Sequence, residues 1–263
     1  MGFTHGLGIG INWTLDRRES VPYDEDSHAA TDKRLETARR HHDFLRWSWE
    51  PRELIDTRTL VPKWAAFDYL RWKTSRINSF GLSALVDPFH LPTLEDTELA
   101  AVTTKSLDVM SVLTWAAQTA LDGLDYRVEV RNEPGIKIQT GVLQPQAKFY
   151  DRCAGILASS PDPSRIVLPC YQAGEGSIGM TKFLPGATYA FHLNLGTIPR
   201  WQNALGQLSG KDVMFTEVSG EAAVLRWVRA HVEESSLHHS CWGMEGSDPL
   251  FTPTFERLLA IGR

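Results

Sequence analysis

Cysteine is scarce in this chain of 263 residues, which contains only Cys153, Cys170 and Cys241. The count is odd and no two of them have the C-x-x-C spacing, so the sequence predicts neither a disulfide framework nor a thiolate zinc site. We expect reduced thiols that pack as small apolar residues.

An excess of positive charge is also missing. The chain has 27 Lys and Arg against 32 Asp and Glu, which gives a formal net charge of −5. Proteins that bind nucleic acid usually carry a basic face, so no nucleic-acid partner is expected. The mild acidity does not identify a substrate.

Long charge-free segments are absent as well. No stretch of about 18 residues lacks charge, so the sequence predicts no membrane-spanning helix and no membrane partner. The start of the chain, Met1–Gly6, has neither a basic region nor a long apolar segment, so no signal peptide is recognised. We expect either a cytoplasmic protein or the mature form of a secreted one, and we assume a monomer.

Signals for cofactors and metals are weak. The glycines of Gly6–Gly10 have neither the spacing nor the following helix of a dinucleotide-binding fingerprint, so no cofactor is expected. The pairs His41-His42 and His238-His239 consist of adjacent residues, which point in different directions on a helix or a strand. Neither pair chelates one ion easily, and no metal site is predicted.

What the sequence does contain is a recurring unit, a short apolar run followed by turn residues and a longer amphipathic segment. Such alternation predicts parallel β/α units, and eight of them close a barrel. We therefore expect an α/β fold, a single (β/α)8 TIM barrel over residues 1–263. The predicted strands are Leu7–Trp13, Phe44–Trp47, Leu82–Val86, Arg127–Val130, Arg165–Leu168, Thr188–Phe191, Val213–Thr216 and Ser240–Gly243.

Helices are predicted between these strands. Pro62–Phe80 begins with a proline, as helices tolerate, and stops at Gly81, a good left-handed terminator. The helix tryptophans Trp64 and Trp115 are expected in the core. The other predicted helices are Ser27–His42, Leu94–Leu121, Gln144–Ala158, Ile198–Leu208, Glu221–Glu234 and Thr254–Ile261.

Two glutamates follow predicted strands directly. Glu133 lies in Asn132-Glu133-Pro134 and Glu217 follows Phe215-Thr216, 84 positions later (217 − 133). That distance accommodates three units of roughly 30 residues, so both carboxylates are expected at the same end of the barrel. A pair of carboxylates that flanks one bond is the apparatus of glycoside hydrolysis.

Other polar and aromatic residues also fall at the predicted carboxyl ends of strands, where catalytic groups of such barrels lie. An arginine there can keep a nucleophilic carboxylate ionised, and indoles provide flat faces for sugar rings. The candidate substrate-binding residues are Trp13, Arg46, Trp47, His90, Asn132, Tyr171, His192, Asn194 and Trp242.

These short motifs, taken in order, resemble the clan A retaining glycoside hydrolases, and family 5, the cellulase- and mannanase-like group, looks most similar. The resemblance rests on Asn132-Glu133-Pro134, Thr216-Glu217, Gly10-Ile11-Asn12-Trp13, Arg46, His192 and Trp242. It implies that Glu133 is the acid/base, that Glu217 is the nucleophile and that Arg46 and Asn132 support the site. It also implies that Trp242 lies under the sugar at the point of cleavage.

The chain departs from the family pattern at two strands. The family usually has His-x-Tyr on the sixth strand, where this chain has His192-x-Asn194. It usually has Asp-x-His on the third strand, where Asp87 and His90 stand one residue further apart.

The function predicted from the sequence is retaining hydrolysis of β-glycosidic bonds in a polysaccharide or oligosaccharide. Brief strand-to-helix connections, apart from Thr14–Asp26 and Trp49–Val61, favour an open groove and internal cleavage. Three alternatives remain open. They are a non-catalytic carbohydrate-binding barrel, a metal-dependent hydrolase that uses His90, His192 and His239, and transglycosylation.

Overall fold

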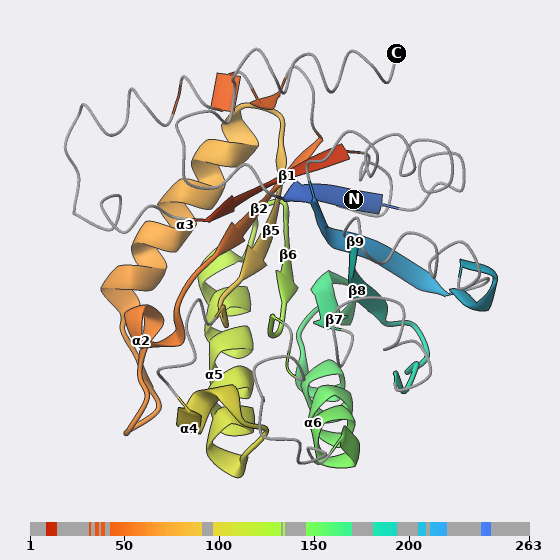
Figure 1. Cartoon of the computed structure of the whole chain (residues 1–263). Coiled ribbons are helices and arrows are strands. Elements are labelled where there is room, and N and C mark those ends of the chain that lie inside the picture. The colour runs from red at the N-terminus through yellow and green to blue at the C-terminus, as the bar shows by residue number, and fades with distance from the viewer. Residues whose placement is uncertain are drawn as a thin grey trace.

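Figure 1 shows the computed structural model of the chain. It describes residues 9–14, 32, 35–36, 38–39, 43–90, 97–132, 134, 146–169, 181–193, 205–208, 211–219 and 238–242. Within these ranges the side chains at 9–14, 97, 193, 205, 217–219 and 238–242 are left out of the description.

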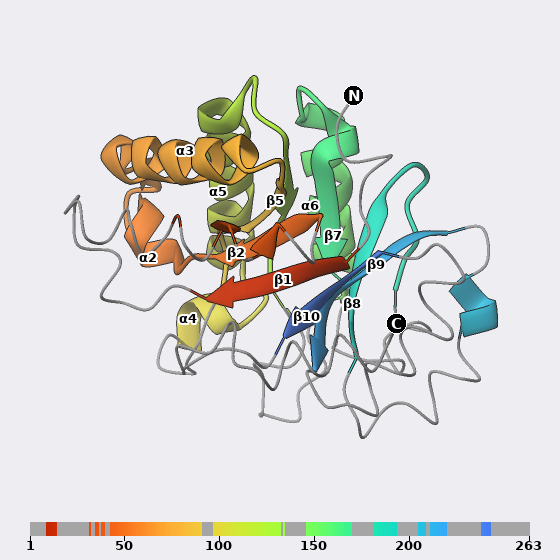
Figure 2. The same ribbon diagram turned by 90° about the horizontal axis from the view of Figure 1, so that it is seen from above.

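The described strands form a closed barrel in which every strand pairs in parallel with its neighbours (Figures 1 and 2). Their order round the barrel is β1-β10-β9-β8-β7-β6-β5-β2. Each strand overlaps one of the eight apolar runs in the sequence, so the predicted strands are confirmed. The bounds are β1 Ile9–Thr14, β2 Phe44–Ser48, β5 Ser83–Asp87, β6 Tyr126–Glu129, β7 Ile166–Pro169, β8 Thr188–Leu193, β9 Asp212–Ser219 and β10 His238–Trp242.

The described helices gather outside the half of the barrel formed by β2, β5, β6 and β7 (Figure 2). The long ones are α3 (Trp64–Ser79), α5 (Thr104–Leu121) and α6 (Gln146–Ser159). The buried residues of α3 recur at helical spacing, which gives the helix one face against the barrel; they are Phe67, Leu70, Lys73, Thr74 and Ile77. Short 3-10 turns occupy Pro163–Arg165 and Leu205–Leu208.

Other predicted helices are covered only in part. Residues 32, 35, 36 and 38 of the predicted helix Ser27–His42 are helical, and only the turn at its end is described for Ile198–Leu208. The predicted helices Glu221–Glu234 and Thr254–Ile261 lie outside the described residues.

The prediction of one continuous helix over Leu94–Leu121 is wrong. The structure has a short helix, α4 (Thr97–Ala100), and then a separate start of α5. Thr103 caps α5, because its hydroxyl accepts from the Ser106 N–H at 3.1 Å while the Ser106 hydroxyl accepts from the Thr103 N–H at 3.0 Å. This reciprocal capping box satisfies N–H groups that a helix start leaves open, so it fixes where α5 begins.

The long connection after β2, predicted as the loop Trp49–Val61, contains regular structure. Helix α2 (Pro51–Leu54) is followed by a two-stranded antiparallel ribbon of β3 (Ile55–Asp56) and β4 (Val61–Pro62). Glu53 closes a capping box at the start of α2, since its Oε2 accepts from the Glu50 N–H at 3.1 Å. The capping box therefore fixes where α2 begins.

Two apolar layers surround the strands. The inner one is a cluster inside the barrel, and the outer one fills the space between strands and helices. In β2 the layers alternate, with Phe44 inside, Leu45 and Trp47 outside, as the two-residue period of a strand requires. The inner cluster consists of Phe44, Leu85, Val167, Ala190 and Met214.

Two of the helix tryptophans expected in the core are instead exposed. Trp64 of α3 is 44% exposed and Trp115 of α5 is 51% exposed, and their ring centroids lie 5.9 Å apart. No helix in the described part of the chain is both long and apolar enough to cross a membrane.

Candidate active site

A polar layer follows the inner apolar cluster toward the carboxyl ends of the strands. On β2, β5, β8 and β9, the residue two positions after each member of the cluster is polar, and residues two apart on a strand share a face. Strand β6 contributes a carboxylate to the same layer. The buried members are Arg46, Asp87, Glu129, His192 and Thr216.

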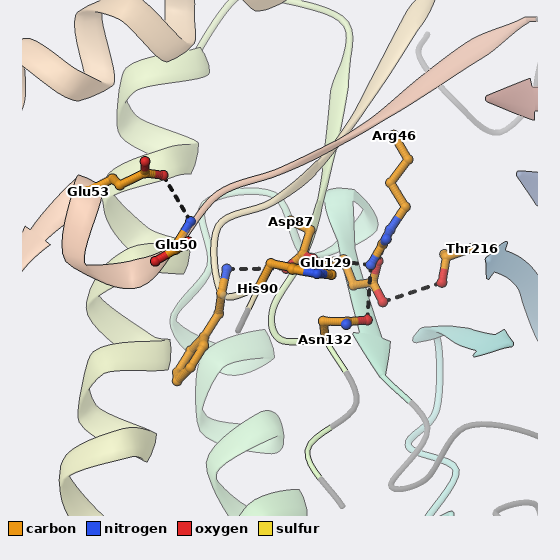
Figure 3. A network of polar contacts seen from close by, with 9 residues as sticks. Arg46, Glu50, Glu53, Asp87, His90, Glu129, Asn132 and Thr216 are labelled. Carbon is orange, nitrogen blue, oxygen red and sulfur yellow. Dashed lines mark hydrogen bonds and ion pairs between the residues drawn. The ribbon is translucent and has the colours of Figure 1, made fainter. Parts of the chain in front are cut away.

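Arg46 lies at the centre of this layer (Figure 3). Its Nε donates to Oε2 of Glu129 at 2.8 Å, and its Nη2 donates to Oδ2 of Asp87 at 3.1 Å. The same Nη2 donates to Oδ1 of Asn132 at 3.1 Å. One guanidinium from β2 therefore joins β5, β6 and the residue three positions past the end of β6.

Asp87 has further partners at the end of β5. Its Oδ2 lies 3.0 Å from Nδ1 of His90, and its Oδ1 accepts from the Phe89 N–H at 3.2 Å. The segment after β5 also contacts the segment after β6, because the Asn132 N–H donates to the carbonyl of Phe89 at 3.2 Å. These bonds fix the backbone at two neighbouring strand ends.

The two buried carboxyl groups respond differently to their surroundings. Burial acts to raise the pKa of Asp87, but the charge of Arg46 and the contact with His90 outweigh it, so that this pKa lies below its ordinary value. Burial raises the pKa of Glu129, and the negative charge of Asp87 adds to the rise while Arg46 and His192 oppose it. When both carboxyls are ionised, Arg46, Asp87 and Glu129 together carry a net negative charge.

Strand β9 has an irregularity at the predicted nucleophile. Its pairing with β8 skips one residue between Phe215 and Glu217, and its pairing with β10 skips one between Phe215 and Val218. Because both neighbours register the extra residue, it belongs to β9 and forms a β-bulge at Thr216–Glu217. The bulge pairs the backbone of Glu217 with that of His192.

A scan against protein-family models and a search of curated proteins gave no match to this sequence. Solved structures do match. A family 5 glycoside hydrolase from Prevotella bryantii superposes with a TM-score of 0.70 at 12% identity, over 98% of this chain and 96% of that one. The chain has the fold of the family 5 glycoside hydrolases.

Two endoglucanases extend the comparison. A tri-modular endo-β-1,4-glucanase of family 5 from Bacillus licheniformis gives a TM-score of 0.72 at 9% identity, over 98% of this chain and 59% of that one. A hyperthermophilic endo-β-1,4-glucanase solved with its substrate gives 0.68 at 13% identity, over 97% of both chains. This chain thus spans less than two thirds of the tri-modular enzyme and nearly all of the other.

Within this family 5 fold, four of the predicted site residues come together. Arg46 and Asn132 are in direct contact, and His90 joins them through Asp87. His192 lies close enough to Glu129 for its charge to act on that carboxyl. These positions are at the carboxyl ends of strands, where barrels of this type hold their catalytic groups.

Trp47 is not brought to this group. Its side chain is 2% exposed and belongs to the layer between strands and helices. Nζ of Lys73, on α3, lies 4.3 Å from its ring centroid. Alternation along β2 explains the difference, since Arg46 faces the barrel interior and its neighbour must face the helices.

The other predicted site residues are described less fully or not at all. Trp13 and Trp242 occupy the predicted strands β1 and β10, with their side chains outside the description. Glu217 is placed by its backbone alone. Glu133, Tyr171 and Asn194 lie outside the described residues. The predicted carboxyl separation of about 5–5.5 Å between Glu133 and Glu217 therefore stays a prediction.

Sequence reasoning missed three members of the network, Asp87, Glu129 and Thr216, as site residues. A signal for two of them was present, because Arg46, Asp87 and Glu129 are charged residues inside otherwise apolar strand runs. Such residues are almost never fully buried unless they are paired. A search for opposite charges on different predicted strands would have paired Arg46 with Asp87 and Glu129.

No group of three or more metal-ligating side chains was found among the described residues. The metal-dependent alternative also uses His239, whose side chain is outside the description.

Cys153 is a free thiol, buried in α6.

Proposed function

We propose that this chain is a retaining glycoside hydrolase, a single (β/α)8 barrel over residues 1–263, that cleaves β-1,4-linked glucans internally. The observation that carries the proposal is the buried network around Arg46 at the carboxyl ends of the strands of a family 5 fold. Asn132, one member, immediately precedes Glu133, and Thr216, another, immediately precedes Glu217.

In the proposed reaction, Glu217 attacks the anomeric carbon while Glu133 protonates the departing oxygen. Glu133 then takes a proton from water, which releases the glycosyl group from Glu217. This double displacement needs two carboxyls about 5–5.5 Å apart, one protonated and one ionised at the start. Neither step requires a cofactor.

The buried charges support this division of roles. Asp87 and Glu129 together outnumber the one guanidinium that they share. A surplus of negative charge raises the pKa of a nearby acid and would keep Glu133 protonated. The division of roles requires that Glu217 lie nearer than Glu133 to Arg46, whose positive charge favours an ionised carboxylate.

Substrate binding follows from the same network. The Oδ1 of Asn132 accepts from Arg46, which orients the amide and leaves its nitrogen as the donor for a sugar hydroxyl. Such a bond to a ring hydroxyl strengthens in the transition state. We propose that Trp13 and Trp242 offer indole faces to the sugar rings and that His90, Tyr171, His192 and Asn194 complete the cleft.

The proposed glucan substrate is supported by the structural neighbours. Several are endoglucanases, and the Prevotella bryantii enzyme has been solved as a variant with a xyloglucan tetradecasaccharide. A chain of this kind would fit an open groove of the sort that the sequence analysis predicts.

Hydrolysis assays test the proposal. Purified wild type, Glu133→Gln and Glu217→Gln are incubated with carboxymethylcellulose, xyloglucan, β-mannan, xylan and chitosan, and reducing ends are counted. Glu98→Gln is the matched control, because Glu98 is exposed on α4 and pairs with Lys105 at 2.6 Å. We expect wild type and control to cut the β-1,4-glucans. Loss of the acid/base in Glu133→Gln should lower the rate at least about 10²–10⁴-fold.

Three outcomes would contradict the proposal. Wild type that binds a glucan without releasing reducing ends would be a carbohydrate-binding barrel. Hydrolysis that both glutamine variants retain would mean that other residues carry the reaction. Activity removed by a chelator and restored by zinc would indicate the metal-dependent alternative.

A further inference from the structure

We propose that Glu129 is a positioning residue for the hydrolysis proposed above. Its carboxylate, paired with Arg46, fixes the end of β6, which precedes Glu133, relative to the bulge of β9, which contains Glu217, and sets the charge that both glutamates feel. The inference rests on the proposed function, and its test is chosen to separate the two.

The contacts of Glu129 lead to both sides of the proposed site (Figure 3). Its Oε2 accepts from Arg46 Nε at 2.8 Å, and Arg46 in turn holds Asn132, the residue before Glu133. Its Oε1 faces the hydroxyl of Thr216 at a longer 3.4 Å, and Thr216 is the residue before Glu217. The pair therefore connects β6 with the bulge of β9 through the barrel interior.

Stability alone does not account for this arrangement. The side chains of Arg46 and Glu129 are 0% and 1% exposed, and a buried ion pair often stabilises a fold no better than well-packed apolar residues would. An apolar pair at this depth could extend the inner cluster that begins one layer below. Unlike an apolar pair, the charged pair Arg46–Glu129 exerts an electrostatic field on the strand ends and makes hydrogen bonds to them.

The charges that face Glu129 come from several strands. Arg46 on β2, Asp87 on β5 and His192 on β8 all act on its carboxyl, while β9 contributes the neutral Thr216. His90 adds to the group through Asp87. Removing the charge of Glu129 would leave Arg46 less fully offset, which stabilises ionised carboxylates nearby and lowers their pKa values.

Glu129→Gln tests this charge. The amide oxygen can still accept from Arg46, so the variant keeps the shape and loses the charge. We expect kcat to fall about tenfold with little change in KM, because the side chain of Glu129 is 1% exposed and would be out of reach of a substrate. Both limbs of the pH profile of kcat/KM should move to lower pH by about one unit, since they report the nucleophile and the acid.

Two further variants separate charge from geometry and from folding. Glu129→Asp keeps the charge but shortens its reach, so kcat should fall while the pH profile stays at its wild-type position. Thr188→Val removes a hydroxyl that accepts from Arg127 at 3.0 Å and donates to Asp212 at 2.6 Å. Thr188 begins β8, at the amino end of the barrel, so this variant controls for the loss of a polar contact away from the site.

A titration independent of turnover completes the test. Protein with ¹³C-labelled glutamate carboxyls is titrated by NMR, with signals assigned from Glu133→Gln and Glu217→Gln. We expect both pKa values to be lower in Glu129→Gln than in wild type. If Glu129→Gln does not fold, the loss of kcat at constant KM in Glu129→Asp decides.

The outcomes are distinct. An active wild type whose pH profile and carboxyl pKa values are unchanged in Glu129→Gln would overturn the inference and leave the proposed function standing. A wild type that cleaves no glucan would overturn the proposed function, and the carboxyl titration would then decide the role of Glu129 alone. Equal losses in Glu129→Gln and Thr188→Val, without any shift of the profile, would reduce Glu129 to a structural residue.

Discussion

A single arginine, Arg46, connects three buried polar side chains of the described barrel, Glu129, Asp87 and Asn132. Arg46 is bound by Glu129 and Asp87, both with side chains at most 1% exposed. Removing one partner of a buried ion pair leaves a charge without compensation, which costs far more than the pair contributes as a whole.

We predict that Arg46→Met lowers the free energy of unfolding by about 3–5 kcal/mol. Arg76→Met is the matched control, because Arg76 makes two hydrogen bonds to Asp32 but the two side chains are 41% and 35% exposed. Breaking an exposed pair should cost about 1 kcal/mol or less. Urea unfolding measures both, and equal costs would contradict the account of the network.

A second prediction concerns pH. The pKa of Asp87 is lower in the folded protein than its ordinary value, so ionised Asp87 stabilises the fold. That contribution is complete above about pH 4, the ordinary pKa of aspartate, and is lost as pH falls through the lowered folded pKa. We expect Asp87→Asn to be less stable than wild type at neutral pH and the difference to shrink in acid. A difference that stays constant as the pH falls would contradict this.

At the residue scale, the sequence predicted part of the buried network. Arg46, Asn132 and His192 were predicted from their positions at strand ends. The structure buries all three and joins Arg46 to Asn132, while their roles toward a substrate stay predictions. The sequence could not reveal that Arg46 is shared between Asp87 and Glu129, because that depends on how β2, β5 and β6 are staggered in space. Trp47 was predicted as a site residue but faces the helices. Successive side chains of a strand point to opposite faces, so a position one residue from Arg46 on β2 lies outside the barrel.

Among the elements, helix ends were predicted less well than strands. Apolar runs identify strands because burial on both faces demands them. The break between α4 and α5 depends on one hydrogen-bonded pair, Thr103 and Ser106, within a segment that is otherwise helical in composition. The end of α3 was predicted correctly, because Gly81 adopts φ +79°.

Two glycines, one after α3 and one inside α6, give a test in which alanine should have opposite effects on stability. Gly81 and Gly155 both have open space where a Cβ would be added, but only Gly81 has a positive φ. We predict that Gly81→Ala lowers the free energy of unfolding by about 1–2 kcal/mol, through left-handed strain. Gly155→Ala, inside α6, should raise it by about 0.5–1 kcal/mol. Thermal unfolding of both variants measures this, and a shift of the same sign would contradict the assigned backbone conformation.

For the whole molecule, eight parallel strands and the fold of family 5 were predictable because eight apolar runs recur at barrel spacing. The chain shares only 9% and 13% identity with the two endoglucanases described above. At that level of identity, the burial pattern and short strand-end motifs specify the fold, while the choice of sugar in the proposed function would depend on side chains in the connections.

The proposed open groove predicts how a polymer is cut. We expect the viscosity of xyloglucan or carboxymethylcellulose to fall early, while few reducing ends have appeared, because internal cuts shorten chains before they release small products. The matched comparison is a commercial exo-acting cellobiohydrolase assayed to the same number of reducing ends. Release of a single small sugar with nearly constant viscosity would contradict internal cleavage.

The central claim is a covalent intermediate on Glu217, and trapping it is the most direct test. Wild type, Glu217→Gln and Glu98→Gln are incubated with a 2-deoxy-2-fluoro-cellobiosyl fluoride, which forms the intermediate but slows its hydrolysis, and are analysed by peptide mass spectrometry. The account predicts one glycosyl adduct on the peptide that contains Glu217, present in wild type and Glu98→Gln and absent from Glu217→Gln. An adduct on another residue, or inverted product with no adduct from an active enzyme, would contradict it.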